Sequence, residues 1–275
     1  MFEEFRFSYY RGRVALFSML KALGVSEGDS VVTQAFTCLA VPEAILATGA
    51  QPIYADVEAG GVNMDPESLS CSVTESTKAI VVQHTFGIPA RMDEILSVAE
   101  RFSIPVIEDC CHTYSSTYRG KRVGSFGVGS FYSFEWGKPL VVGIGGGLNL
   151  NAGKYIDRVA NHYNSMDSPG LADRIKIEIQ YWAFNILLRP SLYWPLKKAF
   201  HKLSKSGLAK GNYNEVGKEE VSRDFSLQLS PSLKARLKRK LKKIDTFARV
   251  SQSNTNYYQQ NIQSKHIKFP VVPKE

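Results

Sequence analysis

Short apolar runs alternate with segments of helical periodicity along the first half of the chain. Residues 14–23 repeat apolar side chains at helical spacing, and Gly24 stands where a helix commonly ends. The runs typical of buried strands are GDSVVTQAF (28–36), PIYADV (52–57), KAIVVQ (78–83) and IPVIED (104–109), with helical segments EAILATGAQ (43–51) and MDEILSVAERF (92–102) between them. Parallel neighbours need a crossover of roughly a dozen residues, usually a helix. The alternation therefore predicts an α/β fold with parallel strands and helices on both faces.

The pattern changes in residues 166–223, which are rich in aromatic residues and broken by Pro190 and Pro195. The longest uncharged run, 179–188, is shorter than the roughly 20 residues that a transmembrane helix needs. Two interpretations remain open. The segment forms helices packed over the domain or at a subunit interface, or it forms a helical hairpin on a membrane surface, with peripheral contact through 175–203. In the second case the lipid-facing residues are Trp182, Phe184, Tyr193 and Trp194, and the headgroup-facing residues are Arg189, Lys197, Lys198 and Lys202.

A polar linker, 204–223, separates this segment from a last long helix. Ser230 and Pro231 provide an N-cap and a first-turn proline for that helix, whose apolar face runs from Leu233 to Ala248. The basic run KARLKRKLKK covers its remaining surface, and no nucleic-acid motif accompanies it, so we expect no nucleic-acid partner. Three units result: a core (1–165), an aromatic and basic helical insertion with linker (166–223), and a long helix that starts a small C-terminal domain (224–275).

Composition favours a globular protein of a reducing compartment. With 275 residues and 44% hydrophobic content, the chain can bury a large core. Its four cysteines are irregularly spaced and no signal peptide precedes them, which predicts a cytoplasmic protein without a disulfide framework. The net charge of +8 resides largely in the last helix and does not by itself identify a partner.

The candidate chemistry begins in PVIEDCCHTYSS (105–116), where a buried strand ends in Glu108 and Asp109. A metal site, a redox pair and the anchor of a cofactor compete as explanations. Adjacent residues such as Cys110, Cys111 and His112 cannot normally all ligate one ion, and neither a second metal cluster nor a CxxC motif is present in the sequence. We therefore expect no metal. The glycine run GIGGG (143–147) lacks the spacing of a dinucleotide-binding loop.

A cofactor that carries a protonated ring nitrogen would suit the remaining residues. Asp109 could pair with a pyridinium, Lys138 lies in a glycine- and aromatic-rich turn, and Ser133 precedes it by five residues. Each also has an ordinary explanation, as a helix cap, a surface lysine and a turn residue.

Five sequence segments, taken together and in order, favour the functional explanation of these residues, because they resemble a known family. They are RGRVAL (11–16), GDSVVTQAFTCLAVPEAILATGAQPIYADV (28–57), QHTFGIPARMD (83–93), VIEDCCHTYSSTYRGKRVGSFG (106–127) and SFEWGKPL (133–140). Together they resemble the pyridoxal 5′-phosphate (PLP)-dependent nucleotide-sugar aminotransferases of the DegT/DnrJ/StrS group. The resemblance implies the aspartate aminotransferase fold (PLP-transferase fold type I), a mostly parallel, mixed sheet between helices. It also implies a chain shortened at both ends, with an incomplete small domain.

The resemblance also implies roles for single residues. Lys138 would bond covalently to PLP, Asp109 would pair with its ring nitrogen, and His112 would lie near the ring. Gly12, Arg13 and Ser133 would hold the phosphate, and Cys38 stands where many members have a ring that stacks on the cofactor. Lysine at position 138 favours transamination over dehydration.

The implied activity transfers an amino group from a donor such as glutamate to a nucleotide-linked keto sugar, for polysaccharide or secondary-metabolite synthesis, in a homodimer. The alternative is a PLP-binding homologue with impaired catalysis that acts as a regulatory or interaction protein. Ser226 and Gln228 replace residues that the family uses to reach the neighbouring subunit.

Overall fold

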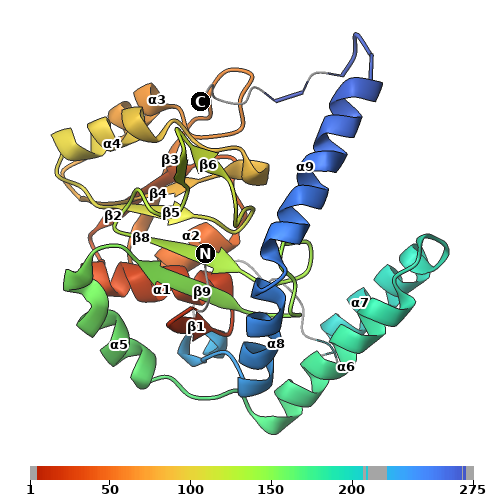
Figure 1. Ribbon diagram of the computed structural model, residues 1–275. Helices are drawn as coiled ribbons and strands as arrows, with labels where there is room; N and C mark the ends of the chain where they lie inside the picture. Colours follow the sequence, from red (N-terminus) through yellow and green to blue (C-terminus); the bar gives the residue numbers. More distant parts are fainter. Residues whose placement is uncertain (1–4, 207–208, 210–221, 268, 271–275) are drawn as a thin grey trace.

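The computed structural model describes residues 5–206, 209, 222–267 and 269–270. Within these residues the chain folds around a seven-stranded sheet of order β1-β9-β8-β5-β4-β2-β3, with helices on both faces (Figure 1). The strands of this sheet are β1 (Phe7–Tyr9), β2 (Ser30–Gln34), β3 (Gln51–Ala55), β4 (Thr77–Gln83), β5 (Val106–Asp109), β8 (Gly129–Ser133) and β9 (Gly146–Leu150). A separate two-stranded ladder pairs β6 (Thr117–Tyr118) with β7 (Lys121–Arg122).

The α-helices follow the strands in the alternation that the sequence predicts. They are α1 (Gly12–Leu23), α2 (Ala40–Leu46), α3 (Pro66–Ser72), α4 (Met92–Arg101), α5 (Ile156–Asn164), α6 (Leu171–Leu187), α7 (Tyr193–Lys205), α8 (Pro231–Leu241) and α9 (Ile244–Asn261). Short 3₁₀ turns are η1 (Thr85–Gly87), η2 (Gly153–Tyr155), η3 (Pro190–Leu192) and η4 (Arg223–Ser226). As predicted, α1 ends at Gly24, whose φ of 85° closes the helix in the left-handed conformation.

The sheet is mixed and mostly parallel, as expected for the α/β fold. Pairs β2–β3, β2–β4, β4–β5 and β5–β8 are parallel, and β9 runs antiparallel to both β8 and β1. Successive strand residues point to opposite faces. Val31, Val81 and Phe131 therefore pack against α1, α2 and α5, whereas Val32 and Tyr132 belong to the core beneath α3, α4 and α8. Burial on both faces explains why these strands have continuous apolar sequences.

The sequence predicts one long C-terminal helix. This prediction is wrong in one respect, because the structure has two helices there, α8 and α9. Helix α8 ends with a tightened bond from the Lys243 N–H to the Lys240 carbonyl (2.9 Å), and α9 begins at Ile244. The turn at Lys242 and Lys243 keeps Ile244 buried, while most of α9 leaves the sheet and is exposed. Ser230 does precede Pro231 at the start of α8, but its hydroxyl lies 3.2 Å from the Ser232 hydroxyl and makes no capping bond.

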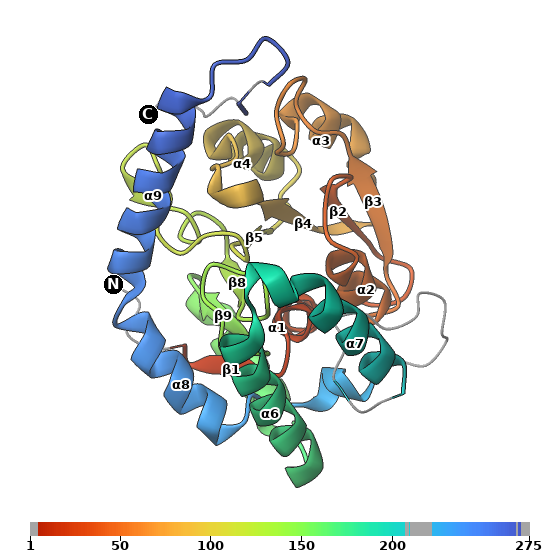
Figure 2. The ribbon, with the colours of Figure 1, turned by 90° about the vertical axis from the view of Figure 1, so that its right-hand side faces the viewer.

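Helices α6 and α7 form a hairpin that extends away from the sheet, with their connection at the far right of Figure 1. Figure 2 shows the same hairpin facing the viewer, in front of α1 and β9. The chain leaves and rejoins the body at one place, because the Asp167 N–H bonds to the Ser226 carbonyl (2.9 Å) and the Gln228 N–H bonds to the Asp167 carbonyl (2.9 Å). Among the described residues, no helix combines the length and apolar character required to cross a bilayer.

Candidate active site

A cavity of about 180 Å³ opens at the carboxyl ends of β5 and β8. All seven residues predicted for the site line it: Gly12, Arg13, Cys38, Asp109, His112, Ser133 and Lys138. They come from α1, from the segment before α2, and from the ends of two neighbouring parallel strands with the loops that follow them. This edge is where open α/β sheets bind ligands. The structure thus brings the predicted residues together around one cavity.

Asp109 is the last residue of β5 and is almost fully buried. Its Oδ1 accepts the N–H of Cys111 (2.9 Å), which fixes the carboxylate at the strand end. Burial raises the pKa of the Cys110 and Cys111 thiols well above the usual value, so both are protonated at neutral pH. A protonated, buried thiol is a poor nucleophile. Neither cysteine therefore has the character of a redox centre.

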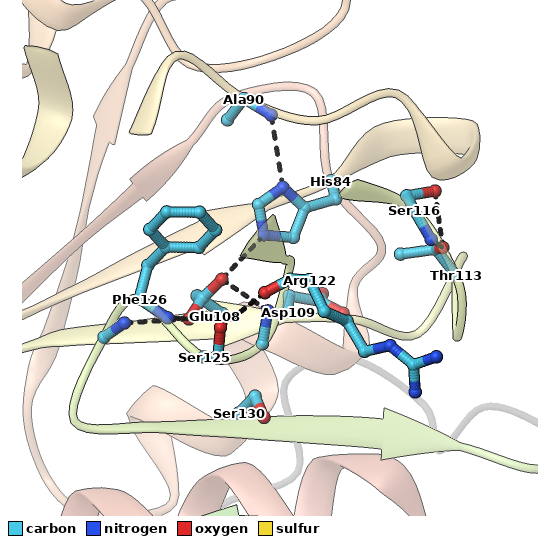
Figure 3. Close-up of polar contacts among 12 residues, drawn as sticks. His84, Ala90, Glu108, Asp109, Thr113, Ser116, Arg122, Ser125, Phe126 and Ser130 are labelled. Atoms are coloured by element: carbon cyan, nitrogen blue, oxygen red, sulfur yellow. Dashed lines mark hydrogen bonds and ion pairs between the residues drawn. The ribbon is translucent and has the colours of Figure 1, made fainter. Parts of the chain in front are cut away.

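Glu108 directly precedes Asp109 in β5, so its side chain points to the opposite face of the sheet. There it holds the loop before β8 (Figure 3). Its Oε1 accepts N–H groups from Phe126 (2.7 Å) and Gly127 (2.8 Å), and its Oε2 accepts the Gly124 N–H (2.6 Å) and His84 Nε2 (3.1 Å). Burial would raise the pKa of Glu108, but the hydrogen bond from His84 and those from the Gly127 and Gly124 amides outweigh it and lower the pKa. Glu108 is thus an ionised structural carboxylate.

The side chains of His84, Glu108 and Cys110 also have their potential ligand atoms within 4.8 Å of one another. The Ala90 N–H donates to His84 Nδ1 (3.1 Å), so the ring proton is on Nε2, where it bonds to Glu108. Figure 3 shows both bonds. Because both ring nitrogens and both carboxylate oxygens already have protein partners, we interpret this cluster as a hydrogen-bonded anchor for the loop beside Asp109.

His112 presents a neutral imidazole to the cavity. The Phe86 N–H donates to His112 Nδ1 (3.2 Å), and the two rings are nearly parallel, with centroids 5.8 Å apart. Burial lowers the pKa of His112, the positive charge of Lys138 lowers it further, and the Asp109 carboxylate raises it by less. Lys138 and Asp109 line the same cavity as the His112 ring.

The loop that carries Lys138 is held by contacts that the sequence reasoning missed. Buried Arg11 bonds to Glu135 (3.2 Å) and to Asp224 (2.6 Å), and the Lys138 N–H bonds to the Glu135 carbonyl (3.3 Å). Burial alone would lower the pKa of Arg11, but Glu135 and Asp224 outweigh it and raise the pKa, which keeps the guanidinium charged. In the sequence, the one sign that Arg11 could belong to the site is its position directly before a helix that begins with glycine.

Trp136, in the same loop, lines the cavity and also contacts the hairpin. Its ring centroid lies 4.1 Å from that of Phe184 and 5.8 Å from that of Tyr181, both on α6. Gln83 lines the cavity from the end of β4, directly opposite Asp109 in the strand register. Its place at a carboxyl strand end was the signal that could have identified it.

The N-terminus of α1 approaches the sheet closely because two positions have no side chain. A Cβ at Gly12 would lie 3.0 Å from that of Ser133, and a Cβ at Gly146 would lie 2.4 Å from the Arg11 carbonyl oxygen. The first N–H groups of a helix have no carbonyl partner within it and carry a partial positive charge. Arg13 adds a guanidinium that forms an ion pair with Glu43 of α2.

The chain is similar to known proteins over most of the residues that form the sheet and the cavity. The model of the DegT/DnrJ/EryC1/StrS aminotransferase family matches residues 7–188. GDP-perosamine synthase of Escherichia coli O157:H7 is 38% identical over 171 residues, which are 62% of this chain and 45% of that protein.

Solved structures show the same fold. An aminotransferase from Psychrobacter cryohalolentis superposes with a TM-score of 0.61 at 25% identity, over 86% of this chain and 51% of that one. NtdA from Bacillus subtilis, solved with bound cofactor PMP, gives a TM-score of 0.51 at 28% identity, over 56% of this chain and 34% of that one. The chain thus spans about half or less of the length of each relative, and the resemblance inferred from the sequence blocks is confirmed.

Proposed function

Because the chain belongs to the DegT/DnrJ/EryC1/StrS aminotransferase family, we propose that it uses PLP to transfer an amino group from an amino acid, such as glutamate, to a keto group of a nucleotide-linked sugar. The observation that carries the proposal is that Lys138 and Asp109 line one cavity with the N-terminus of α1. A lysine, a carboxylate and an anion-binding helix end are the groups that PLP requires. The similarity to GDP-perosamine synthase supports the class of acceptor.

The cavity fits PLP at its two ends. The close approach of α1 to β8, which glycine at position 12 permits, brings the N–H groups of the helix start beside the Ser133 side chain. This cradle suits a phosphate, with Arg13 at its edge. At the other end, the buried Asp109 carboxylate would hold a proton on the pyridine nitrogen, since the N–H of Cys111 already orients it. When bound, PLP supplies an electron-withdrawing ring and carries the amino group between the two substrates.

Lys138 is the proposed base of the reaction. In the first half-reaction its Nζ would take the proton from the α-carbon of the donor and pass it to the cofactor. In the second half-reaction it would move a proton in the reverse direction, from the cofactor to the sugar carbon that receives the amino group. The bond from its own N–H to Glu135, and the ion pair of Glu135 with Arg11, hold the loop that presents the amine. His112 would cover one face of the cofactor ring, because Phe86 fixes its orientation from behind.

Dimerisation, which is typical of the family, is part of the proposal. Gln228, at a position where the family reaches the neighbouring subunit, instead donates to the Tyr163 carbonyl of its own chain (2.8 Å). Its side chain therefore joins the segment before α8 to the end of α5 within the same chain. A contribution of the partner to the phosphate site would have to come from other residues.

Absorbance during a PLP titration tests the cofactor and the lysine. We expect the yellow absorbance of lysine-bound PLP in the parent protein and in Lys154→Ala, a control lysine in η2 outside the cavity, and its loss in Lys138→Ala. Glutamate should then bleach the band in the parent. A band that ignores every amino donor would instead identify a PLP-binding protein without transferase activity, and absence of the band would overturn the cofactor assignment.

The acceptor is tested in a second assay. Parent protein preloaded with PLP and glutamate is given a panel of GDP-, UDP- and dTDP-linked keto sugars, and amino-sugar formation is measured by mass spectrometry. Turnover of a keto sugar with no nucleotide at an equal rate would contradict the proposed substrate class.

A further inference from the structure

The outer half of the α6–α7 hairpin lacks a partner within the described chain. The inner half of α6 is anchored, because Ile177 and Tyr181 are buried and Arg236 of α8 lies 3.8 Å from the centroid of the Tyr181 ring. Beyond Phe184, the eleven residues 185–195 are all exposed. We call residues 185–195 the hairpin tip. It lies at the end of the hairpin farthest from the sheet (Figure 1).

The hairpin tip and the outer face of α6 are strongly apolar. Large exposed side chains in the tip are Ile186, Leu187, Leu188, Leu192, Tyr193 and Trp194, of which Ile186 is 61% and Trp194 64% exposed. A stripe along α6 leads to them, formed by exposed Leu171, Ile175, Ile179, Trp182 and Ile186. Their spacing of three or four residues places them on one face of the helix. Isolated exposed apolar residues are normal, but a continuous patch marks an interaction surface.

The charge around the tip has one sign. Residues 179–206 contain no aspartate or glutamate, but they contain Arg189, Lys197, Lys198, Lys202 and Lys205. Arg189 lies within the tip, and Lys197 lies above the rings of Tyr193 (5.7 Å) and Trp194 (5.2 Å). Aromatic rings next to lysine and arginine, beside an apolar surface, are the arrangement that interfacial helices use at lipid headgroups.

From these observations we propose that the hairpin tip docks on an anionic membrane surface, with its apolar side chains among the acyl chains and its basic side chains at the headgroups. A second copy of this chain is the competing occupant. Pairing two tips would place basic residues against basic residues, with no acidic partner in residues 179–206 of either copy, whereas an anionic bilayer complements them. The tip is also a narrow projecting end, which suits insertion between headgroups better than the broad contact that a stable dimer needs.

Docking would orient the candidate active site relative to the bilayer. Trp136, which lines the cavity, packs on Phe184 at the base of the hairpin tip. An apolar groove of about 430 Å³ between α6 and α7 is also lined by Trp136, together with Ala183, Leu196 and Phe200. The loop of Lys138 is therefore in contact with the element that would bind lipid. The proposal itself does not depend on the transaminase activity.

Vesicle flotation with the full chain tests the proposal. We expect the parent protein to float with vesicles of equimolar phosphatidylglycerol and phosphatidylcholine, and to float less as salt is raised. The reversal Lys197→Glu with Lys198→Glu is expected to lower the partition coefficient by about thirtyfold or more, since each basic residue near an anionic surface contributes roughly one kcal/mol. Ile186→Ser with Trp194→Ser is expected to lower it by at least about tenfold.

Matched controls come from the C-terminal helices. Lys242→Glu with Lys243→Glu reverses two adjacent exposed lysines, and Tyr257→Ser with Tyr258→Ser removes two exposed rings of α9, of which Tyr257 is 64% exposed. Neither pair should change flotation by more than about twofold. All variants alter exposed residues, and circular dichroism checks that they fold.

Three results would overturn the proposal. The first is a parent protein that stays at the bottom of the gradient with anionic vesicles. The second is a loss of flotation in the two control variants, the paired lysine reversal and the paired tyrosine replacement, that equals the loss in the tip variants. The third is a tip variant that floats like the parent but changes the molecular mass measured by analytical ultracentrifugation, which would identify the tip as an interface between copies of the chain.

Discussion

Replacement of Glu108 by glutamine offers a direct test of how the site is supported. In the parent, each carboxylate oxygen accepts two hydrogen bonds, Oε1 from Phe126 and Gly127, and Oε2 from Gly124 and His84. A glutamine has one oxygen and one NH₂ group, so whichever way the amide turns, two buried or partly buried donors face a donor. An unsatisfied buried donor costs about 1–3 kcal/mol, which gives a loss of unfolding free energy of about 2–6 kcal/mol.

The measurement is urea denaturation followed by circular dichroism at pH 7. Glu100→Gln, an exposed glutamate on α4, serves as the matched control and should change stability by less than about 0.5 kcal/mol. The pH dependence provides a second readout. Because the folded-state pKa of Glu108 is lowered from its ordinary value of 4.5, the stability due to the carboxylate is complete above that value and is lost as the pH falls through the folded pKa.

The difference in unfolding free energy between the parent and Glu108→Gln should therefore be largest near neutral pH and become smaller under acidic conditions. A loss smaller than about 1 kcal/mol at pH 7, or a gap that is the same at every pH, would refute the assignment of Glu108 as an ionised anchor. Because Glu108 directly precedes Asp109, the variant should also bind PLP more weakly than the Glu100→Gln control.

Three further changes test the same site. Arg11→Met leaves the carboxylate of Asp224 buried without its cation, so we expect a loss of about 3–5 kcal/mol in the unfolding free energy measured by urea denaturation; equal stability would contradict the ion-pair assignment. Gly146→Ala pushes a Cβ against the Arg11 carbonyl and should cost about 1–3 kcal/mol and weaken PLP binding, whereas Gly153→Ala, which meets no atom within 4 Å, should do neither. Asp109→Asn should weaken PLP binding by about 10–100-fold in an absorbance titration, because it removes a charge-assisted hydrogen bond.

The strands and the candidate site were predictable because both are encoded locally. Continuous apolar runs bounded by turns predicted β2, β4 and β5 to within two residues at each end, and the carboxyl end of β5 marked Asp109. The break between α8 and α9 was not predictable in this way, since the apolar spacing continues through it to Ile244. What redirects the chain there is burial against the sheet, a tertiary effect that periodicity does not contain.

The ion pairs of Arg11 were equally beyond sequence reasoning. Its partners are 124 and 213 residues away, and nothing in the composition around either partner distinguishes it from a surface carboxylate. The pairing of residues 227–229 with β1 could not be predicted either, because the two segments are far apart in the sequence. Motif order identified the residues that face the cavity, while the groups that hold them in place became visible only through the fold.

The late closure of the sheet edge has a consequence for synthesis on the ribosome. The first strand, β1, pairs with β9 on one side, and on the other it is covered by the bonds from the Tyr10 N–H to the Leu227 carbonyl (3.0 Å) and from the Leu229 N–H to the Ser8 carbonyl (2.9 Å). A nascent polypeptide therefore exposes that edge until residue 229 has emerged, and pairings so distant in sequence form slowly. The free edge of β1, which packs against the helix that carries Gly12, is thus covered by a segment that is translated long after β1 itself.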